Sequence, residues 1–358
     1  MSVPTPRLVL DIRGQPASLA RVLDQHAGPG RRSLDAAAQL LKSSPRVIVA
    51  GIGASLNAAI PFEYVLCAHG IQCESVEAGE LLHYRLEACG GATLVLVSRS
   101  GESVEIAKVL AALRGRVPIV GVTNEAGSTL AQQSDVVLEV GSLPDEMVAI
   151  QTHTGTLLTL YLLAMTALNR YADARRELDR LLPQLPAWIE ASLGVDWGPF
   201  LDGDSCVYAL GRGASYGSAV QAALLFSEIA KAPAVAMPVA SFRHGPMEII
   251  DGRFRALVFV PRGRTRDLNV CLAKDILRFG GAVRLIGAGD RREPGLEWIA
   301  PPSCAEMLAP LVEIVPAQAA AVRLAEIRGL VVGSFRFVPQ VTRDEATTAP
   351  AATEAVDG

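Results

Sequence analysis

The chain has 358 residues, 50% of them hydrophobic, which is enough for two ordinary domains with sizeable cores. The formal net charge is -4 and the Lys and Arg residues are dispersed, so we expect no nucleic-acid partner. The cysteines lack C-x-x-C spacing, no apolar stretch is long enough to span a bilayer, and the N-terminus lacks an apolar signal core. We therefore expect a cytoplasmic protein with no metal, no cofactor and no membrane partner.

Short apolar runs followed by glycine turns dominate the first half of the chain. After an N-terminal helical extension, the run Arg46–Ala50 predicts a strand that ends in the glycine turn Gly51–Ser55 and is followed by a helix. Further strands are predicted at Thr93–Val97 and Ile119–Val122. The alternation of strands with amphipathic helices is typical of a parallel sheet that is covered on both faces and binds ligands at the carboxyl ends of its strands.

A polar loop, Ser98–Ser103, follows the second of these strands. Ser98, Ser100 and Ser103 offer hydroxyl donors, Gly101 permits close backbone approach, and the amides that open the next helix add partial positive charge. The chain has neither a P-loop lysine after the glycine nor a G-x-G-x-x-G fingerprint. The loop therefore predicts a site for a sugar phosphate rather than a nucleotide, although such turns also occur in proteins without phosphate affinity.

The same pattern of an apolar strand, a glycine turn and a helix recurs in the second half of the chain. A predicted strand at Val207–Leu210 leads into the glycine turn Gly211–Ser215, 160 residues (211 minus 51) after the first turn. Strands are again predicted downstream, at Ala256–Val260 and Val283–Ile286. The ordered recurrence predicts an α/β fold with two tandem, doubly wound parallel-sheet domains, each a flavodoxin-like three-layer α/β/α unit.

Composition also predicts where the domains begin and end. A helix predicted at Leu157–Leu182 is interrupted by prolines and glycines between Leu185 and Asp204, and the tail beyond Arg343 has almost no large apolar residue. We expect that tail to be mobile and without function. The predicted units are a helical extension at 1–44, a phosphate-binding domain at 45–190, a second domain at 200–332 and a C-terminal tail at 333–358.

The second domain carries an acid and a base where the first carries serines. Glu228 follows the second glycine turn, and His244 lies 16 residues later (244 minus 228) in the motif Phe242–Pro246. A carboxylate that moves a proton between adjacent sugar carbons, with an imidazole that assists ring opening, is sufficient for enediol chemistry. Taken singly, each residue could instead be an ordinary surface or turn residue, and only their occurrence with the serine loop favours catalysis.

Together these motifs resemble the sugar isomerase (SIS) domain family, and within it the double-SIS isomerase half of glutamine-dependent glucosamine-6-phosphate synthase and related phosphosugar deaminases and deglycases. The resemblance covers residues 9 to about 343. It depends on Glu228, on His244 and on these motifs: Asp11–Pro16, Gly53–Ala58, Ser98–Ser103, Thr123–Asn124 and His244–Pro246.

The resemblance implies a role for each matching residue. It implies that Ser98, Ser100 and Ser103 hold the substrate's phosphate, with Arg99 where glutamine is usual. It also implies that Ser55 and Thr152 line the sugar pocket. Glu228 matches the base for proton transfer between C1 and C2, and His244 matches the residue for ring opening, which a neighbouring subunit commonly supplies. A homodimer with shared active sites is therefore implied.

Departures from the family narrow the expected reaction. No glutaminase domain precedes the SIS pair, so we expect no glutaminase activity. Pro339 or Gln340 stands where the synthase has its imine-forming lysine, and Leu225 and His153 replace two further lysines of the pattern. Because Lys274 is the last lysine in the chain, the amine has no later substitute. Such losses spare proton transfer and suit enzymes whose substrate already carries its nitrogen.

We therefore expect a phosphosugar isomerase or deaminase that acts on a 6-phosphorylated amino sugar or fructosamine. Three alternatives stay open at this point: a plain aldose-ketose phosphate isomerase, a non-catalytic phosphosugar sensor, and a biosynthetic enzyme for an unusual amino sugar. The missing lysines favour the sensor, whereas the lack of a convincing DNA-binding module argues against it.

Overall fold

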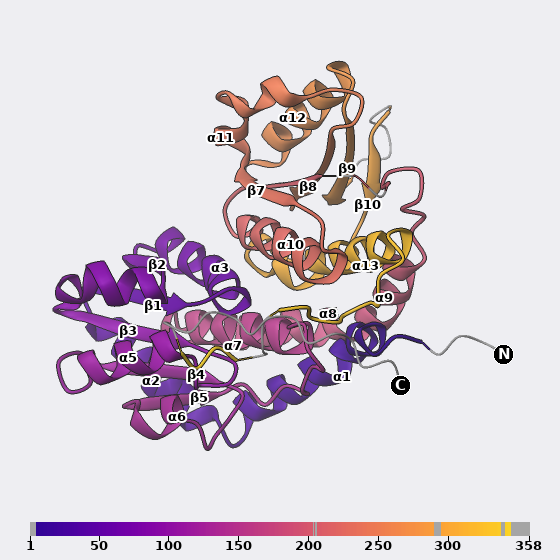
Figure 1. Cartoon of the computed structure of the whole chain (residues 1–358). Helices are drawn as coiled ribbons and strands as arrows, with labels where there is room; N and C mark the ends of the chain where they lie inside the picture. Colours follow the sequence, from indigo (N-terminus) through magenta and orange to yellow (C-terminus); the bar gives the residue numbers. More distant parts are fainter. Residues whose placement is uncertain (1–4, 203, 205, 290–294, 338–340, 345–358) are drawn as a thin grey trace.

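The computed structural model describes residues 5–202, 204, 206–289, 295–337 and 341–344. It contains two five-stranded sheets, with strand orders β2-β1-β3-β4-β5 and β10-β9-β8-β6-β7, and every adjacent pair of strands is parallel (Figure 1). The strands of the first sheet are β1 (Arg46–Gly51), β2 (Cys73–Glu77), β3 (Ala92–Val97), β4 (Ile119–Thr123) and β5 (Val136–Glu139). The strands of the second are β6 (Val207–Gly211), β7 (Ala234–Pro238), β8 (Arg255–Val260), β9 (Ala282–Gly287) and β10 (Glu297–Ile299).

Helices cover both faces of each sheet. In the first half they are α1 (Arg7–Ala27), α2 (Arg31–Ser43), α3 (Ala54–Ala68), α4 (Ala78–Glu80), α5 (Val104–Leu113), α6 (Thr129–Gln133), α7 (Gln151–Ala167) and α8 (Tyr171–Leu181). In the second they are α9 (Leu185–Leu193), α10 (Ser215–Ala230), α11 (Val239–Arg243), α12 (Arg266–Arg278) and α13 (Pro310–Ile327). The two sheets have the same strand order when read from their first strands outward, which confirms two tandem α/β domains.

The central strands formed where the apolar runs predicted them, because both of their faces are buried. Alternate residues of β3 contact different cores: Val95 and Val97 pack toward α2, α3 and α7, whereas Leu94 and Leu96 pack toward α5. A strand buried on both faces is apolar throughout, and such runs are easy to recognise in a sequence. The helices α3 and α7 and their counterparts α10 and α13 share one continuous core between the two sheets (Figure 1).

The structure differs from the predicted helix at Leu157–Leu182. One helix, α7, already begins at Gln151 and ends at Ala167, and a second, α8, begins at Tyr171. The break lies at Asn169, whose φ of 58° is left-handed and cannot continue a helix. The prolines that were predicted to interrupt the chain at 183 and 186 instead occupy first-turn positions of a short 3-10 helix, η3 (Leu182–Gln184), and of α9.

The two domains meet through helices that begin at their glycine turns. Helix α10 packs against both α3 and α13. A Cβ atom on Gly217 of α10 would lie 2.7 Å from Cδ of Pro61 in α3, so the glycine permits the close contact. Asn57 Nδ2 of α3 donates to Gln221 Oε1 of α10 at 2.9 Å. None of the described helices combines the length and the apolar character needed to cross a lipid bilayer.

A buried carboxyl group lies in this helical layer. Glu313 of α13 is fully buried, and the Ser218 hydroxyl of α10 donates to its Oε2 at 3.2 Å. Burial raises the pKa of Glu313 to about 8. Because the unfolded chain ionises this group near its ordinary value, the free energy of unfolding should fall as the pH rises from about 4.5 to 8.

We therefore expect Glu313→Gln to stabilise the protein at pH 8 by about 2 to 4 kcal/mol and to have little effect at pH 5. Urea unfolding at both pH values measures the difference. Glu80→Gln, at an exposed position of α4, is the control and should change stability little at either pH. An equal effect of Glu313→Gln at pH 5 and pH 8 would contradict the assigned titration.

Candidate functional site

The serine loop follows β3 and leads into α5, as the sequence predicts. The Ser98 hydroxyl accepts a hydrogen bond from the Gly101 backbone N–H at 3.1 Å, and the Ser100 hydroxyl accepts one from the Glu102 N–H at 3.2 Å. Ser103 is the N-cap residue of α5, and its Oγ lies 3.5 Å from that of Ser98. Three hydroxyl groups are thus held at the N-terminus of a ten-residue helix, an arrangement that favours an anion.

Glu102 does not lie in the first turn of α5, where a carboxylate would face a bound anion. Helix α5 begins at Val104, and the Glu102 carboxylate accepts hydrogen bonds from the Thr129 N–H at 2.6 Å and the Thr129 hydroxyl at 2.9 Å. This carboxylate therefore binds the N-terminus of α6, where its negative charge interacts favourably with the helix dipole.

Gly101 is required by the loop for two reasons. Its φ of +65° is left-handed, and a Cβ atom there would overlap the Ser128 side chain. We expect Gly101→Ala to weaken phosphosugar binding by at least about tenfold, because the serine hydroxyls would be displaced. Calorimetric titration with a hexose 6-phosphate measures the loss.

Gly91 offers a matched control for Gly101→Ala. Its φ is +76°, but nothing lies within 4 Å of the position that its Cβ atom would occupy. Gly91→Ala should therefore cost only about 1 to 2 kcal/mol of stability through its backbone and leave binding unchanged. Equal binding losses in both variants would show that backbone strain, and not the geometry of the loop, is responsible.

Six of the residues predicted for the site line one cavity of about 310 Å³. They are Ser55, Ser98, Arg99, Ser100, Ser103 and Glu228. The serines come from the first domain, where β1 and β3 end, whereas Glu228 comes from the last turn of α10 in the second domain. The packing of α10 against α3 explains this meeting, because Leu224 of α10 lies beside the first glycine turn, 3.8 Å from the Cβ position of Gly53.

The duplication is chemically asymmetric. At the 160-residue offset that relates the glycine turns, the counterpart of Glu228 is Ala68. The serine loop follows β3, and after β8, which holds the same place in the second sheet, the sequence is Pro261–Gly263. The first domain therefore supplies hydroxyl groups, and the second supplies the carboxyl group.

Glu228 has a perturbed acidity. Burial raises its pKa to about 7, and the positive charges of Lys231 and Arg99 oppose the rise. The Lys231 ammonium donates to the backbone carbonyls of Glu228 and Ser334. A carboxyl group with a pKa near neutrality can both accept and return a proton.

Lys231→Met should shift the pH dependence of any reaction that needs the Glu228 carboxylate. Loss of the ammonium raises the pKa of Glu228, so turnover should fall a few-fold at pH 6 and change little at pH 9. Lys231→Arg keeps the charge and should keep the wild-type profile. Lys274→Met, an exposed position on α12, is the control. A uniform loss across the pH range would contradict an electrostatic role for Lys231.

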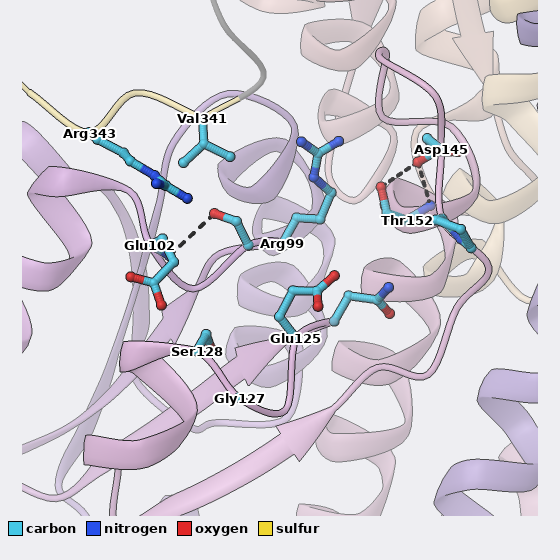
Figure 2. Close-up of a pocket in the computed structure, with 12 residues that line it drawn as sticks. Arg99, Glu102, Glu125, Gly127, Ser128, Asp145, Thr152, Val341 and Arg343 are labelled. Atoms are coloured by element: carbon cyan, nitrogen blue, oxygen red, sulfur yellow. Dashed lines mark hydrogen bonds between the residues drawn. The ribbon is translucent and has the colours of Figure 1, made fainter.

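Thr152 lies apart from the 310 Å³ cavity. It lines a second cavity of about 420 Å³, where its hydroxyl donates to Asp145 Oδ2 at 2.5 Å (Figure 2). The Asp145 carboxylate also accepts backbone N–H groups of Ile150, Gln151 and Thr152, so it caps the start of α7. Arg99, Ser100 and Val341 line both cavities, which therefore adjoin.

Within one chain, His244 does not share a cavity with Glu228. It is the exposed C-cap residue of α11 and does not line either cavity. The first domain has a histidine at the corresponding place: Glu77 and Pro238 occupy the same register positions in the two sheets, and His83 and His244 each follow six residues later. His83 is also exposed.

Three residues that the sequence analysis assigned to the tail belong to the site. Phe335, Val341 and Thr342 line the 310 Å³ cavity, and the Thr342 carbonyl accepts the Val104 N–H at the start of α5, at 3.2 Å. The segment after α13, yellow in Figure 1, thus returns to the first domain. The apolar residues at 335–341 were the available signal, since the sequence beyond Arg343 has few of them.

The SIS domain family matches residues 40–168 and 204–287, more than half of the chain. The chain belongs to the SIS family. A glutamine–fructose-6-phosphate aminotransferase of Pyrobaculum aerophilum is 28% identical over 333 residues, which are 90% of this chain and 55% of that protein. The chain spans about half the length of the curated relatives it matches.

Solved structures share the double-SIS fold. The C-terminal domain of a glucosamine-fructose-6-phosphate aminotransferase from Francisella tularensis superimposes with a TM-score of 0.84 at 20% identity, covering 92% of this chain and 99% of that one. A glucosamine-6-phosphate deaminase from Thermotoga maritima superimposes with a TM-score of 0.75 at 20% identity, covering 94% and 99%. At this identity the likeness shows the fold.

Two of the positions at which the resemblance expects a lysine, Leu225 and His153, lie among the described residues. Leu225 is fully buried in α10, where it packs in the core between the sheets. His153 is buried in α7, its Nδ1 lies 3.1 Å from the Ala54 carbonyl, and burial lowers its pKa to about 4. The imidazole is therefore neutral at pH 7 and connects α7 to the start of α3. Pro339 and Gln340 lie outside the described residues.

Proposed function

We propose that this SIS protein is a phosphosugar isomerase or deaminase that acts on a 6-phosphorylated amino sugar or fructosamine. The observation that carries the proposal is one cavity that combines a serine loop at a helix N-terminus with the carboxyl group of Glu228. In the proposed arrangement Ser98, Ser100 and Ser103 bind the phosphate, and Ser55 faces the sugar. Glu228 moves the proton between C1 and C2.

The proposed reaction moves one proton between C1 and C2 and then exchanges the nitrogen for the oxygen of water. With an open-chain 2-amino aldose, Glu228 takes the C2 proton, the aldehyde oxygen takes a proton from solvent, and the proton on Glu228 returns to C1. The C2–N bond becomes an imine, water adds at C2, and the nitrogen leaves as ammonium to give a ketose phosphate. With a 1-amino ketose, the proton moves from C1 to C2, and water releases the amine from C1 to give an aldose phosphate.

The lysine positions favour release of an existing amine over its installation. Leu225 and His153 are buried and carry no primary amine, and Pro339 or Gln340 stands where the resemblance expects the imine-forming lysine. Enediol proton transfer needs only the carboxyl group, whose pKa of about 7 suits it to act as base and then as acid.

The functional unit we propose is a homodimer in which His244 of each chain serves the cavity of its partner. This assignment is supported by the exposure of His244 and its absence from the cavity of its own chain. The imidazole would assist opening of the sugar ring.

Incubation with glucosamine 6-phosphate, galactosamine 6-phosphate and a fructosamine 6-phosphate tests the proposal. Release of ammonia or amine should accompany formation of a ketose or aldose phosphate. Interconversion of aldose and ketose phosphates without any release of nitrogen would establish a plain isomerase instead.

The replacement of the amine positions by Leu225 and His153 also favours a second function, a non-catalytic phosphosugar sensor. Saturable binding of these ligands with no turnover of any of them would establish the sensor and refute the enzyme.

A further inference from the structure

The 420 Å³ cavity adjoins the proposed reaction site and is not used by it. Arg99 lies where the two cavities meet, because it lines both of them. The negative charges of Glu228 in the first cavity and of Asp145 and Glu125 in the second act on its guanidinium. Figure 2 shows Arg99 between Asp145 on one side and Val341 and Arg343 on the other. A group attached to the nitrogen of a substrate held beside Glu228 could extend past Arg99 into this space.

Two of the three carboxylates that line this second cavity already accept hydrogen bonds from other residues of the protein. Asp145 caps α7 through three backbone N–H groups and the Thr152 hydroxyl, and Glu102 accepts two hydrogen bonds from Thr129. Glu125 is exposed at the edge. The cations are Arg99 and Arg343, of which Arg99 is the more buried. A guanidinium presents five N–H donors in a planar fork that matches a carboxylate.

We propose that the second cavity binds a carboxylate-bearing substituent on the substrate's nitrogen, such as an N-linked amino acid, and that Arg99 recognises its carboxylate. The inference rests on the proposed function, which places the nitrogen beside Glu228. It makes Arg99 the residue that selects a substituted amino sugar over a simple one.

The mixed charge of the cavity favours this ligand over a second phosphate. A phosphate dianion would face three carboxylates, from Glu102, Glu125 and Asp145. An amino-acid moiety carries one negative and one positive charge, so its carboxylate can bind Arg99 while its ammonium group faces Glu125. Such a zwitterion is complementary to a cavity lining that contains both positively and negatively charged side chains.

Calorimetric titration of the Glu228→Gln protein measures binding without turnover. Three ligands are compared: 1-deoxy-fructose 6-phosphate linked at C1 to the ε-nitrogen of lysine, the same compound with the carboxylate converted to an amide, and fructose 6-phosphate. The carboxylate should bind about 10- to 100-fold more tightly than the amide. Adding Arg99→Gln should reduce that ratio to about 1, whereas adding Arg114→Gln, at an exposed position after α5, should leave it unchanged.

Two results would overturn the inference while the proposed function stands. One is equal affinity for carboxylate and amide. The other is a preference for the carboxylate that survives Arg99→Gln, with all three ligands weakened alike, which would assign Arg99 to the phosphate. No binding of any of the three ligands would refute the phosphosugar site itself, and the inference with it.

Discussion

Replacement of Glu228 by Gln is expected to lower turnover of the amino-sugar phosphate by about 10²- to 10⁴-fold while leaving phosphosugar binding intact. The amide has nearly the same shape as the carboxyl group but cannot accept the C1 or C2 proton. Since burial raises the pKa of Glu228 to about 7, wild-type turnover should also fall as the pH drops below 7, where the group is protonated. Rates of product formation between pH 5 and 9, with Kd from calorimetry, measure both effects.

The conservative change Glu228→Asp should restore part of the activity, because the base is kept but displaced. Glu80→Gln, at an exposed position of α4, is the control and should behave as wild type. Wild-type turnover in Glu228→Gln would refute the assignment of the base. If Glu228→Gln loses substrate binding as well as turnover, the role of Glu228 is to bind the substrate, and its assignment as the base is not supported.

Two inactive variants should regain activity when they are combined in one dimer. His244→Ala alone should lower turnover by about 10²-fold, because ring opening loses its imidazole. In a heterodimer of Glu228→Gln and His244→Ala chains, one cavity has both defects and the other has neither, if each histidine serves the partner's cavity. Co-expression with two affinity tags isolates this heterodimer, which should show about half of the wild-type activity per dimer.

His83→Ala is a demanding control for that experiment. His83 occupies the same place in the first domain and is also exposed, so a general effect of removing a surface histidine would appear there too. We expect His83→Ala to retain wild-type activity. A heterodimer as inactive as its parents would instead show that His244 acts in its own chain or not at all.

The sequence predicted the strands that are buried on both faces and failed at the edges of the sheets. Strands β1, β3 and β8 are mostly apolar along their length, and β9 is apolar apart from Arg284. By contrast β2, with the sequence Cys-Glu-Ser-Val-Glu, and β5, β7 and β10 were not predicted. Each of these four strands lies at an edge or is only partly buried, so polar residues are tolerated and the apolar signal disappears.

The serine loop was also readable from the sequence, because its chemistry is local. Ser98, Gly101 and Ser103 act within six residues of one another, and the strand before them and the helix after them are encoded by adjacent residues. The duplication was readable for a similar reason, since each glycine turn is specified by its own short motif.

Only the tertiary structure decided which distant residues share a cavity. The packing of α10 on α3 brings Glu228 to the serine loop and leaves His244 exposed elsewhere, although both lie in the second domain. The return of residues 341–343 to the start of α5 and the meeting of two cavities at Arg99 depend on long-range contacts in the same way. The sequence by itself determined the local elements and their chemistry, because short-range sterics and hydrophobic burial specify them. The composition of the site was decided by helix packing between domains, which no local pattern encodes.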